Sequence, residues 1–200
     1  MGASERDEFL RAAWRALVGG ALDARRFVLV DEMGTNTSLC VLYGWARRGH
    51  RAYFRVPRNR GANVALPSSM NHSGMGPSLA VEGPTTREVF EAYLEKILAP
   101  ELLPGQIVLM DNLSSHKGPR VRELLEGRGY ELLYLLPPYS PDLNPIEEAF
   151  AKTKALLRRI GARTREALIE AIGRALDEVT ASDVLGFFEH RGYRLLAQPL

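Results

Sequence analysis

The sequence contains little cysteine and no long apolar stretch. Cys40 is the one cysteine among 200 residues, which excludes an internal disulfide framework and a cysteine-based zinc site. A reducing cytosol is therefore the expected compartment. No segment approaches the roughly 18 consecutive apolar residues that a membrane span requires, and the opening residues MGASERDEFL do not have the pattern of a signal peptide. The composition predicts a globular chain of one main domain.

Acidic residues are absent from residues 33–81, although the whole chain carries a net charge of only +2. The same stretch is rich in arginine, with Arg47, Arg48, Arg51, Arg55, Arg58 and Arg60. Arginine side chains match the geometry of phosphate oxygens, so this stretch is a candidate surface for binding nucleic acid. A solvated, arginine-rich hairpin is the alternative interpretation.

Hydrophobic patterns predict a chain in which strands come first and helices later. Strands are expected at 26–31, 38–49, 50–57, 105–112 and 130–138, with a turn at Arg48–Gly49 and more strand within 62–83. Helices are expected at 6–18, 85–98, 119–129, 145–160, 164–179 and 182–190. The first three strands favour antiparallel pairing, and the later strand–helix–strand units favour parallel pairing. The product is a mixed sheet with helices on both faces.

Two of the most apolar predicted strands end in aspartate: FVLVD ends at Asp31 and IVLMD ends at Asp111. An ionised carboxylate beside a buried strand is costly unless a positive group meets it. Each aspartate alone is also typical of a turn or cap. Two carboxylates on adjacent parallel strands repel each other, and a divalent cation offsets that repulsion. Oxygen ligands favour Mg²⁺ or Mn²⁺ over Zn²⁺.

A third carboxylate is expected from the stretch LLPPYSPDLNPIEEAF at 135–150. Asn144 and Pro145 are typical of an N-cap and a first helical residue, and Glu147 then occupies the position of a capping-box acid. The apolar stripe of the following helix places Glu147 on its flank and Glu148 on the opposite side. Glu147 is therefore predicted to reach a site at the sheet edge, and Glu148 to be solvated.

The motifs VDEMGTN, LMDNLSSHK and LLPPYSPDLNPIEEAFAKTK resemble the catalytic motifs of mariner-like bacterial insertion-sequence transposases of the DDE superfamily. The resemblance runs from about Arg26 to Ile160. It implies an α/β, RNase H-like fold, with a mixed five-stranded sheet of three antiparallel strands followed by parallel strands, and helices on both faces. The catalytic, metal-binding residues of the family fall on Asp31, Asp111 and Glu147. Two Mg²⁺ ions are implied as cofactors, with Mn²⁺ as a substitute.

The resemblance also implies a function: metal-dependent DNA cleavage at transposon ends, then strand transfer of the 3′-hydroxyl into target DNA, with TA sites as targets in relatives. The expected organisation is an N-terminal helix or linker at 1–25, a catalytic domain at 26–160 and packed C-terminal helices at 161–200. Residues 1–25 are too short for the helix-turn-helix modules of the family. The chain is therefore expected to be the catalytic half alone: the second reading frame of a split element that works with a separate helix-turn-helix segment, a trimmed form, or a decayed copy.

The same resemblance implies a homo-oligomer on DNA in the bacterial cytoplasm, associated with the nucleoid. Two other functions stay open. One is an RNase H-like nuclease that cuts without strand transfer, and the other is a catalytically silent DNA-binding remnant of a transposon. Retention of all three carboxylates argues against the silent remnant.

Further residues are expected to support the site or to contact DNA. Asn112 and His116 either touch phosphate or orient a ligand, or else form the loop that caps the helix at Pro119. Asn144 is expected to act first as a helix cap and also to support the site. The expected DNA-binding residues are basic, and solvation of their charges is the alternative: Arg47, Arg48, Arg51, Arg58, Arg60, Lys117, Lys152 and Lys154.

Overall fold

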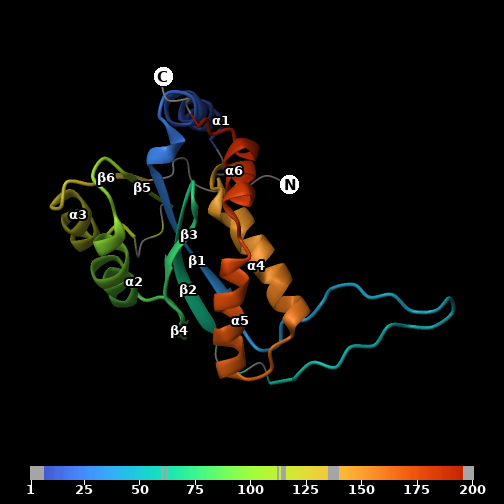
Figure 1. Cartoon of the computed structure of the whole chain (residues 1–200). Helices are drawn as coiled ribbons and strands as arrows, with labels where there is room; N and C mark the ends of the chain where they lie inside the picture. The colour runs from blue at the N-terminus through green and yellow to red at the C-terminus, as the bar shows by residue number, and fades with distance from the viewer. Residues whose placement is uncertain are drawn as a thin grey trace.

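The computed structural model describes residues 7–59, 61, 63–111, 113, 116–134 and 140–195. Its centre is a mixed sheet with strand order β3-β2-β1-β5-β6, and a short β4 pairs with β2 (Figure 1). The strands are β1 (Phe27–Thr35), β2 (Val64–Asn71), β3 (Gly74–Ser78), β4 (Val81–Glu82), β5 (Ile107–Met110) and β6 (Glu131–Tyr134). The expected five-stranded arrangement is confirmed along the main path, and β4 adds a sixth strand.

Pairing directions follow the sequence pattern. β2 runs antiparallel to β1 and to β3, while β5 runs parallel to β1 and to β6. A helical crossover joins β5 to β6, whereas the connection from β1 to β5 runs through β2, β3 and β4 before its helices. The central strand β1 is buried on both faces because neighbouring strands and helices cover it on each side.

Helices cover both faces of the sheet, as predicted (Figure 1). Phe27 and Leu29 of β1 belong to the core beneath α4 (Ile146–Ile160), α5 (Arg165–Asp177) and α6 (Ala181–His190). Val28 and Val30 point into the core beneath α2 (Arg87–Tyr93) and α3 (Pro119–Glu126). This alternation along β1 is the two-residue period of a strand, and it divides the interior into two hydrophobic clusters.

The N-terminal helix α1 (Glu8–Trp14) begins at Asp7, whose side chain accepts hydrogen bonds from the backbone of Phe9 and Leu10. It continues as a π-helical turn, η1 (Arg15–Gly19). Trp14 and Val18 are buried in the same core as α4, α5 and α6. The short connecting helices are η2 (Ala24–Arg26), η3 (Leu94–Leu98), η4 (Ala99–Glu101) and η5 (Pro141–Leu143).

Residues 36–59, with 61 and 63, form a long two-legged arm that extends away from the body (Figure 1). The strands predicted at 38–49 and 50–57 are wrong, since the described residues of this segment contain no strand. Tyr43, Trp45 and Tyr53 gave the segment a strand-like composition, but their side chains are 91%, 103% and 87% exposed. Without a neighbouring strand to pair with, a strand-like composition does not produce a sheet.

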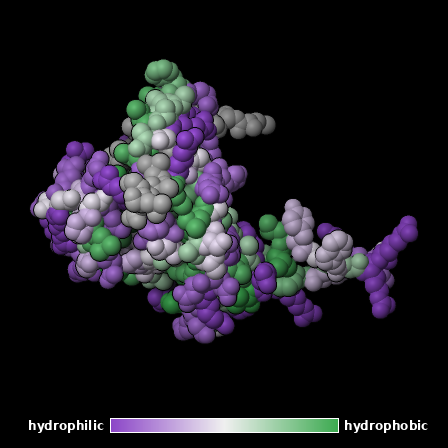
Figure 2. Space-filling view, turned by 45° about the horizontal axis from the view of Figure 1, so that its top comes forward, coloured by the Kyte–Doolittle hydropathy of each residue, from purple (hydrophilic) through white to green (hydrophobic). Residues whose placement is uncertain are grey.

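The turn predicted at Arg48–Gly49 is confirmed at the tip of the arm. His50 donates its backbone N–H to the carbonyl of Arg47 at 2.9 Å, and Gly49 has a φ of +83°. A positive φ of this size favours glycine. Strand structure resumes only at Val64, within the segment 62–83 that was expected to contain more strand. The outer end of the arm is hydrophilic (Figure 2).

None of the helices in the described part of the chain is long and apolar enough to cross a membrane.

Candidate catalytic site

Asp31 and Asp111 occupy equivalent places on neighbouring parallel strands. Val30 pairs with Met110 at the last position of the β1–β5 register, so the two aspartates are the next residues in both segments. The prediction that Asp31 ends its strand is wrong, because β1 continues to Thr35 and Asp31 pairs with Ser68 of β2. Asp111 does follow the end of β5. Adjacent strands lie about 4.8 Å apart, which makes the two residues close neighbours.

Glu147 lies in the first turn of α4 and is exposed. Asp31 shares a face of β1 with Leu29 and Met33, which pack in the core that includes α4. Burial raises the pKa of the Asp31 carboxyl to about 7, and the negative charges of Glu147 and Asp111 add to that rise. The backbone N–H of Glu32 and the charge of His116 act in the opposite direction. Asp31 is therefore near enough to both other carboxylates for their charges to raise its pKa.

Asn144 contacts Asp31 instead of capping α4, so its expected role as first of all a helix cap is wrong. Its Nδ2 donates to Asp31 Oδ2 at 2.8 Å, and the helix begins after Pro145 without a side-chain cap among the described residues. The other oxygen of Asp31 accepts the backbone N–H of Glu32 at 2.7 Å. Asn144 is 3% exposed, and its Oδ1 has no hydrogen-bond partner in the part of the chain described.

His116 joins two carboxylates. Its Nδ1 lies 2.6 Å from Asp111 Oδ1, and its Nε2 lies 2.8 Å from Glu32 Oε1. Its ring stacks on Phe90 with centroids 4.1 Å apart, and its side chain is fully buried. Burial lowers the pKa of His116, but hydrogen bonds and charges from Asp111 and Glu32 outweigh burial and raise the pKa to about 9. The doubly protonated imidazole therefore donates to both carboxylates.

The geometry decides between the two interpretations of His116. The helix α3 has Gly118 at its N-cap and no side-chain cap among the described residues, so the His116 side chain contacts Asp111 and does not cap the helix. Sequence reasoning missed Glu32, the other partner of His116. Its only signal was its place directly after Asp31 in VDEMGTN. Asn112 lies outside the described residues.

Glu148 is not solvated as predicted, because it forms an ion-pair cluster with the end of α6. Its Oε1 lies 2.5 Å from Arg191 Nε and 2.8 Å from His190 Nδ1, and its side chain is only 20% exposed. The facing argument correctly placed Glu148 on a different side of α4 from the core. It did not foresee that residues more than 40 positions later in the chain would cover that side.

The candidate DNA-binding residues have different surroundings. Arg47, Arg48, Arg51 and Arg58 are exposed on the arm, and Lys117 is exposed after His116. Lys154 is half-buried on α4, and Arg60 lies outside the described residues. Lys152 is held within the fold, since its Nζ lies 2.6 Å from Asp183 Oδ2 and 2.7 Å from the carbonyl oxygen of Glu178.

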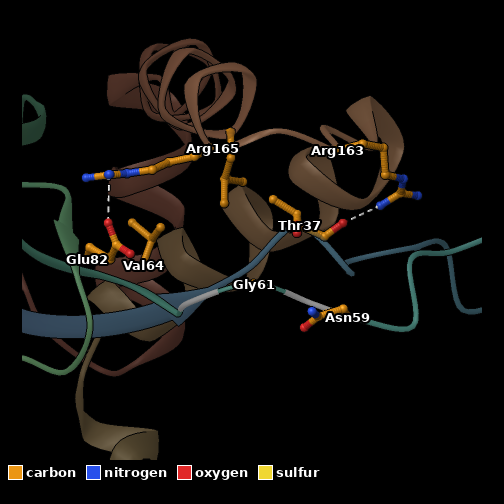
Figure 3. Close-up of a pocket in the computed structure, with 8 residues that line it drawn as sticks. Thr37, Asn59, Gly61, Val64, Glu82, Arg163 and Arg165 are labelled. Carbon is orange, nitrogen blue, oxygen red and sulfur yellow. Dashed lines mark hydrogen bonds and ion pairs between the residues drawn. The ribbon is translucent and has the colours of Figure 1, made fainter.

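The base of the arm meets the connection between α4 and α5 at a pocket of about 330 Å³ (Figure 3). Arg163 donates from Nη1 to the carbonyl oxygens of Thr37 and Leu39, both at 2.8 Å. Its guanidinium carbon also lies 5.9 Å from the ring centroid of Phe54 on the returning leg. Arg165 pairs with Glu82 at 2.7 Å on the other side of the pocket. None of the three carboxylates lines this pocket.

The donors around Asp31 fit a hard divalent cation. Carboxylate oxygens of Asp31, Asp111 and Glu147 are the ligand type that Mg²⁺ and Mn²⁺ prefer. A buried carboxylate whose proton affinity is raised by two negative neighbours gains stability from an added positive charge. Among the described residues, however, no three His, Cys, Asp or Glu side chains are close enough to hold a metal ion as they stand.

Comparison with known proteins relates the chain to DNA transposases. It is 26% identical over 191 residues to the Transposable element Tc1 transposase of Caenorhabditis elegans, covering 90% of this chain and 70% of that protein. The Mos1 transposase paired-end complex with left transposon end matches with a TM-score of 0.70 at 19% identity, over 92% of this chain. The catalytic domain of Mos1 mariner transposase matches with a TM-score of 0.61 at 19% identity, over 92% of this chain and 84% of that one.

These structural matches confirm the expected RNase H-like α/β fold. This chain spans 56% of the length of the Mos1 chain in the paired-end complex. The sequence profile described as DDE superfamily endonuclease matches residues 26–169. That match extends over more than half of the chain and includes Asp31, Asp111 and Glu147, so the protein belongs to the DDE superfamily endonuclease family.

Proposed function

We propose that this chain is the catalytic domain of a DNA transposase, which cleaves DNA at transposon ends and transfers the 3′-hydroxyl strand into target DNA. Asp31, Asp111 and Glu147 are the proposed catalytic residues. The observation that carries the proposal is the placement of Asp31 and Asp111 directly after the paired residues Val30 and Met110 of neighbouring parallel strands, with Glu147 in the first turn of α4, in a chain that belongs to the DDE superfamily endonucleases.

The carboxylates of Asp31, Asp111 and Glu147 are the proposed holders of two Mg²⁺ ions, for which Mn²⁺ can substitute. The Mos1 paired-end complex has been solved with Mg and with Mn, which supports this choice. When bound, such ions polarise a phosphodiester and favour the ionised form of an attacking water or hydroxyl. Glu147 is the most exposed of the three carboxylates and lies in the first turn of α4, so the proposal requires its side chain to turn toward Asp31 when metal binds.

The chain's own residues orient these ligands. Asn144 and the backbone N–H of Glu32 each hold one oxygen of Asp31, which fixes the plane of its carboxylate. His116 does the same for Asp111 from its position against Phe90. Such partners of metal ligands maintain the geometry of a site and strengthen its affinity for metal.

Basic residues provide the proposed DNA contacts. Arg47, Arg48, Arg51 and Arg58 on the arm are exposed and available to phosphate, and Lys117 is exposed close in sequence to Asp111. Arg60 and Lys154 complete the proposed set. Lys152 is left out because its ammonium group pairs with Asp183. Related structures are complexes with transposon-end DNA, which supports DNA as the substrate.

The wider context is also a proposal. The motifs quoted above favour a mariner-like element of bacterial insertion-sequence type, acting in the cytoplasm at the nucleoid. A homo-oligomer on paired ends, TA target sites and a separate helix-turn-helix segment fit the same assignment. The division into 1–25, 26–160 and 161–200 remains our proposal for the domain organisation.

The test is a reaction with supercoiled plasmid and labelled oligonucleotides from the DNA that flanks the coding sequence, with Mg²⁺ or Mn²⁺. We expect labelled oligonucleotide joined to plasmid, and no product with Asp111→Asn. Glu123→Gln on the surface of α3 is the matched carboxylate control and should behave as wild type. Metal-dependent nicking without joining would indicate a nuclease instead. The absence of any metal-dependent cleavage would contradict the proposal and favour a silent DNA-binding remnant.

A further inference from the structure

Arg11 of α1 is a fully buried arginine that contacts the loop before α4. Its Nη1 donates to Ser140 Oγ at 2.7 Å and to Asp142 Oδ1 at 2.9 Å, and its Nη2 pairs with Asp142 Oδ2. Its Nε lies 3.3 Å from Glu8 Oε2 within the same helix. The two parallel contacts to Asp142 form the bidentate arrangement that gives arginine–carboxylate pairs their directional specificity.

A second contact from the N-terminal helix reaches the same loop. Trp14 Nε1 donates to the hydroxyl of Tyr193 at 3.3 Å, and that hydroxyl donates to the carbonyl of Leu143 at 2.6 Å. The helix α1 thus acts on two neighbouring residues of η5, directly on Asp142 and through Tyr193 on Leu143. The contact through Tyr193 is buried, whereas the contact of Arg11 with Asp142 is part-buried, since the Asp142 side chain is 37% exposed.

The loop that contains Ser140 and η5 leads directly to the residues around Asp31. The backbone N–H of Leu143 bonds to the carbonyl of Ser140, and that of Asn144 bonds to the carbonyl of Pro141, so η5 moves as one rigid turn. Asn144 ends this turn and donates to Asp31. Glu147 follows three residues later, in the first turn of α4. A displacement of Asp142 therefore displaces both groups.

The ion pair between the buried Arg11 and the part-exposed Asp142 is a weak source of stability, because the cost of removing Arg11 from water and the screening of Asp142 by water offset most of the attraction. Its directional geometry is a better explanation for an arginine at this place. We propose that Arg11 is a positioning residue: through Asp142 and Ser140 it sets the placement of Asn144 and Glu147 relative to Asp31. The consequence for catalysis rests on the proposed function, whereas the placement of Asn144 does not.

The variants Arg11→Met, Asp142→Asn and their combination test this proposal in the full chain. Methionine fills much of the arginine volume and removes the hydrogen-bonding fork. Arg11→Lys keeps the charge without the fork. The matched control is Leu102→Ala, which removes buried apolar volume before β5, at the opposite end of that strand from Asp111.

The first measurements are Mn²⁺ affinity by calorimetry and the steady-state kinetics of DNA cleavage. We expect Arg11→Met to weaken Mn²⁺ binding at least tenfold and to lower kcat at least tenfold, with KM for DNA nearly unchanged. Arg11→Lys should fall between wild type and Arg11→Met. The double variant should lose no more Mn²⁺ affinity or kcat than either single variant, since both substitutions break the same contact.

Leu102→Ala should lower Tm without weakening Mn²⁺ binding. Mn²⁺ affinity of Arg11→Met within twofold of wild type would overturn the proposal, and so would an equal loss in Leu102→Ala. Either result would mean that Arg11 only stabilises the folded protein.

A second measurement separates this proposal from the proposed function. If the wild-type protein neither binds Mn²⁺ nor cleaves DNA, the proposed function fails, but the side-chain amide signals of Asn144 in a ¹⁵N-labelled sample still report its contact with Asp31. We expect Arg11→Met to shift these signals and Leu102→Ala to leave them in place. Unchanged Asn144 signals in Arg11→Met would overturn the role assigned to Arg11.

Discussion

Glu147 and Glu148 are identical neighbours in the first turn of α4, yet their side chains have different surroundings. Glu147 is exposed and its charge acts on Asp31, whereas Glu148 is paired with Arg191 and His190. The helical period explains the difference, because consecutive residues point about 100° apart around the helix axis. Glu147 is placed for the proposed chemistry, and Glu148 stabilises the packing of α6 against α4.

This contrast predicts opposite effects of two conservative changes. Glu147→Gln should lower cleavage by at least about 100-fold, because even outer partners of metal ligands are worth about 10- to 100-fold. Glu148→Gln should retain cleavage and metal binding but lose on the order of 1 kcal/mol of stability, since it weakens a half-buried ion pair. Cleavage assays and denaturant unfolding measure the two effects. Equal loss of cleavage in both variants would contradict the assignment of Glu147.

The raised pKa of Asp31, about 7, predicts a pH-dependent metal affinity. A cation binds the ionised carboxylate, so below pH 7 it must displace a proton, and the affinity should fall by about tenfold per pH unit. Above pH 7 the carboxylate is already ionised and the affinity should level off. Calorimetric titration with Mn²⁺ from pH 5.5 to 8.5 measures this curve. A flat profile across that range would contradict the pKa assigned to Asp31.

His116 predicts a pH-dependent stability in a separate range. Its pKa is about 9 in the fold and about 6.5 in an unfolded chain. The folded protein therefore holds this proton more tightly, and the stabilisation is complete below pH 6.5 and lost as pH rises through 9. The loss should be on the order of 2 kcal/mol. Urea unfolding at pH 7 and pH 9 measures it, and His116→Asn should remove the difference. If His116→Asn lost the same free energy of unfolding between pH 7 and pH 9, the pH dependence would belong to another titrating group.

Local sequence patterns indicated the carboxylates and also indicated Asn144 and His116 as supporting residues, but they did not predict which contacts these two residues make. Asp31, Asp111 and Glu147 follow apolar segments and proline-rich turns that are visible in the sequence. The contact between Asn144 and Asp31 joins residues 113 positions apart, so a local capping rule could not foresee it. Arg11 and Ser140 are 129 positions apart. Long-range hydrogen bonds of this kind depend on how the elements pack.

Secondary-structure elements were predicted well where hydrophobic periodicity is backed by burial. β5 and α4 fall close to their expected ranges because a continuous apolar run or an apolar stripe faces a core in each case. The strands predicted in the arm do not form, because Trp45 and its aromatic neighbours are exposed, and β2 and β3 provide the antiparallel strands beside β1 instead. Composition alone cannot state which of two strand-like segments finds a partner.

Arg163 is predicted to hold the base of the arm. Each of its hydrogen bonds to Thr37 and Leu39 is worth about 1 kcal/mol, so the loss of both in Arg163→Ala should raise local opening about 30-fold. Cys40, which is the one thiol of the chain and half-buried beside Leu39, reports this opening through its rate of reaction with a disulfide reagent. Arg165→Ala is the matched control, since it breaks the pair with Glu82 and not the arm contacts. Similar reaction rates in both variants would contradict the role of Arg163.

Charge is unevenly distributed over the molecule as a whole. The stretch 33–81 contains no acidic residue, and most of it forms the projecting arm and the outer strands of the sheet. The opposite face of the sheet carries α2 and α3, where arginines pair with glutamates, as Arg120 does with Glu95 and Glu123. DNA is therefore expected to approach from the side of the arm.

The arm arginines predict how DNA binding responds to salt. Replacing Arg47, Arg48, Arg51 and Arg58 by alanine should reduce the slope of log K against log salt by up to about 3.6, since each released phosphate contact is worth about 0.9. Fluorescence anisotropy with a labelled duplex measures the slope. Lys96→Ala combined with Arg128→Ala provides a control with exposed basic residues elsewhere. An unchanged slope in the arm variant would mean that these arginines are only solvated.

The positions of the two tryptophans give the protein a pair of built-in optical reporters. Trp14 is 7% exposed and donates a hydrogen bond to Tyr193, while Trp45 is fully exposed on the arm. Emission from the first should be blue-shifted and shielded from acrylamide, and emission from the second red-shifted and readily quenched. Binding of DNA along the arm should therefore alter one signal, and release of the N-terminal helix the other, in the same unlabelled sample.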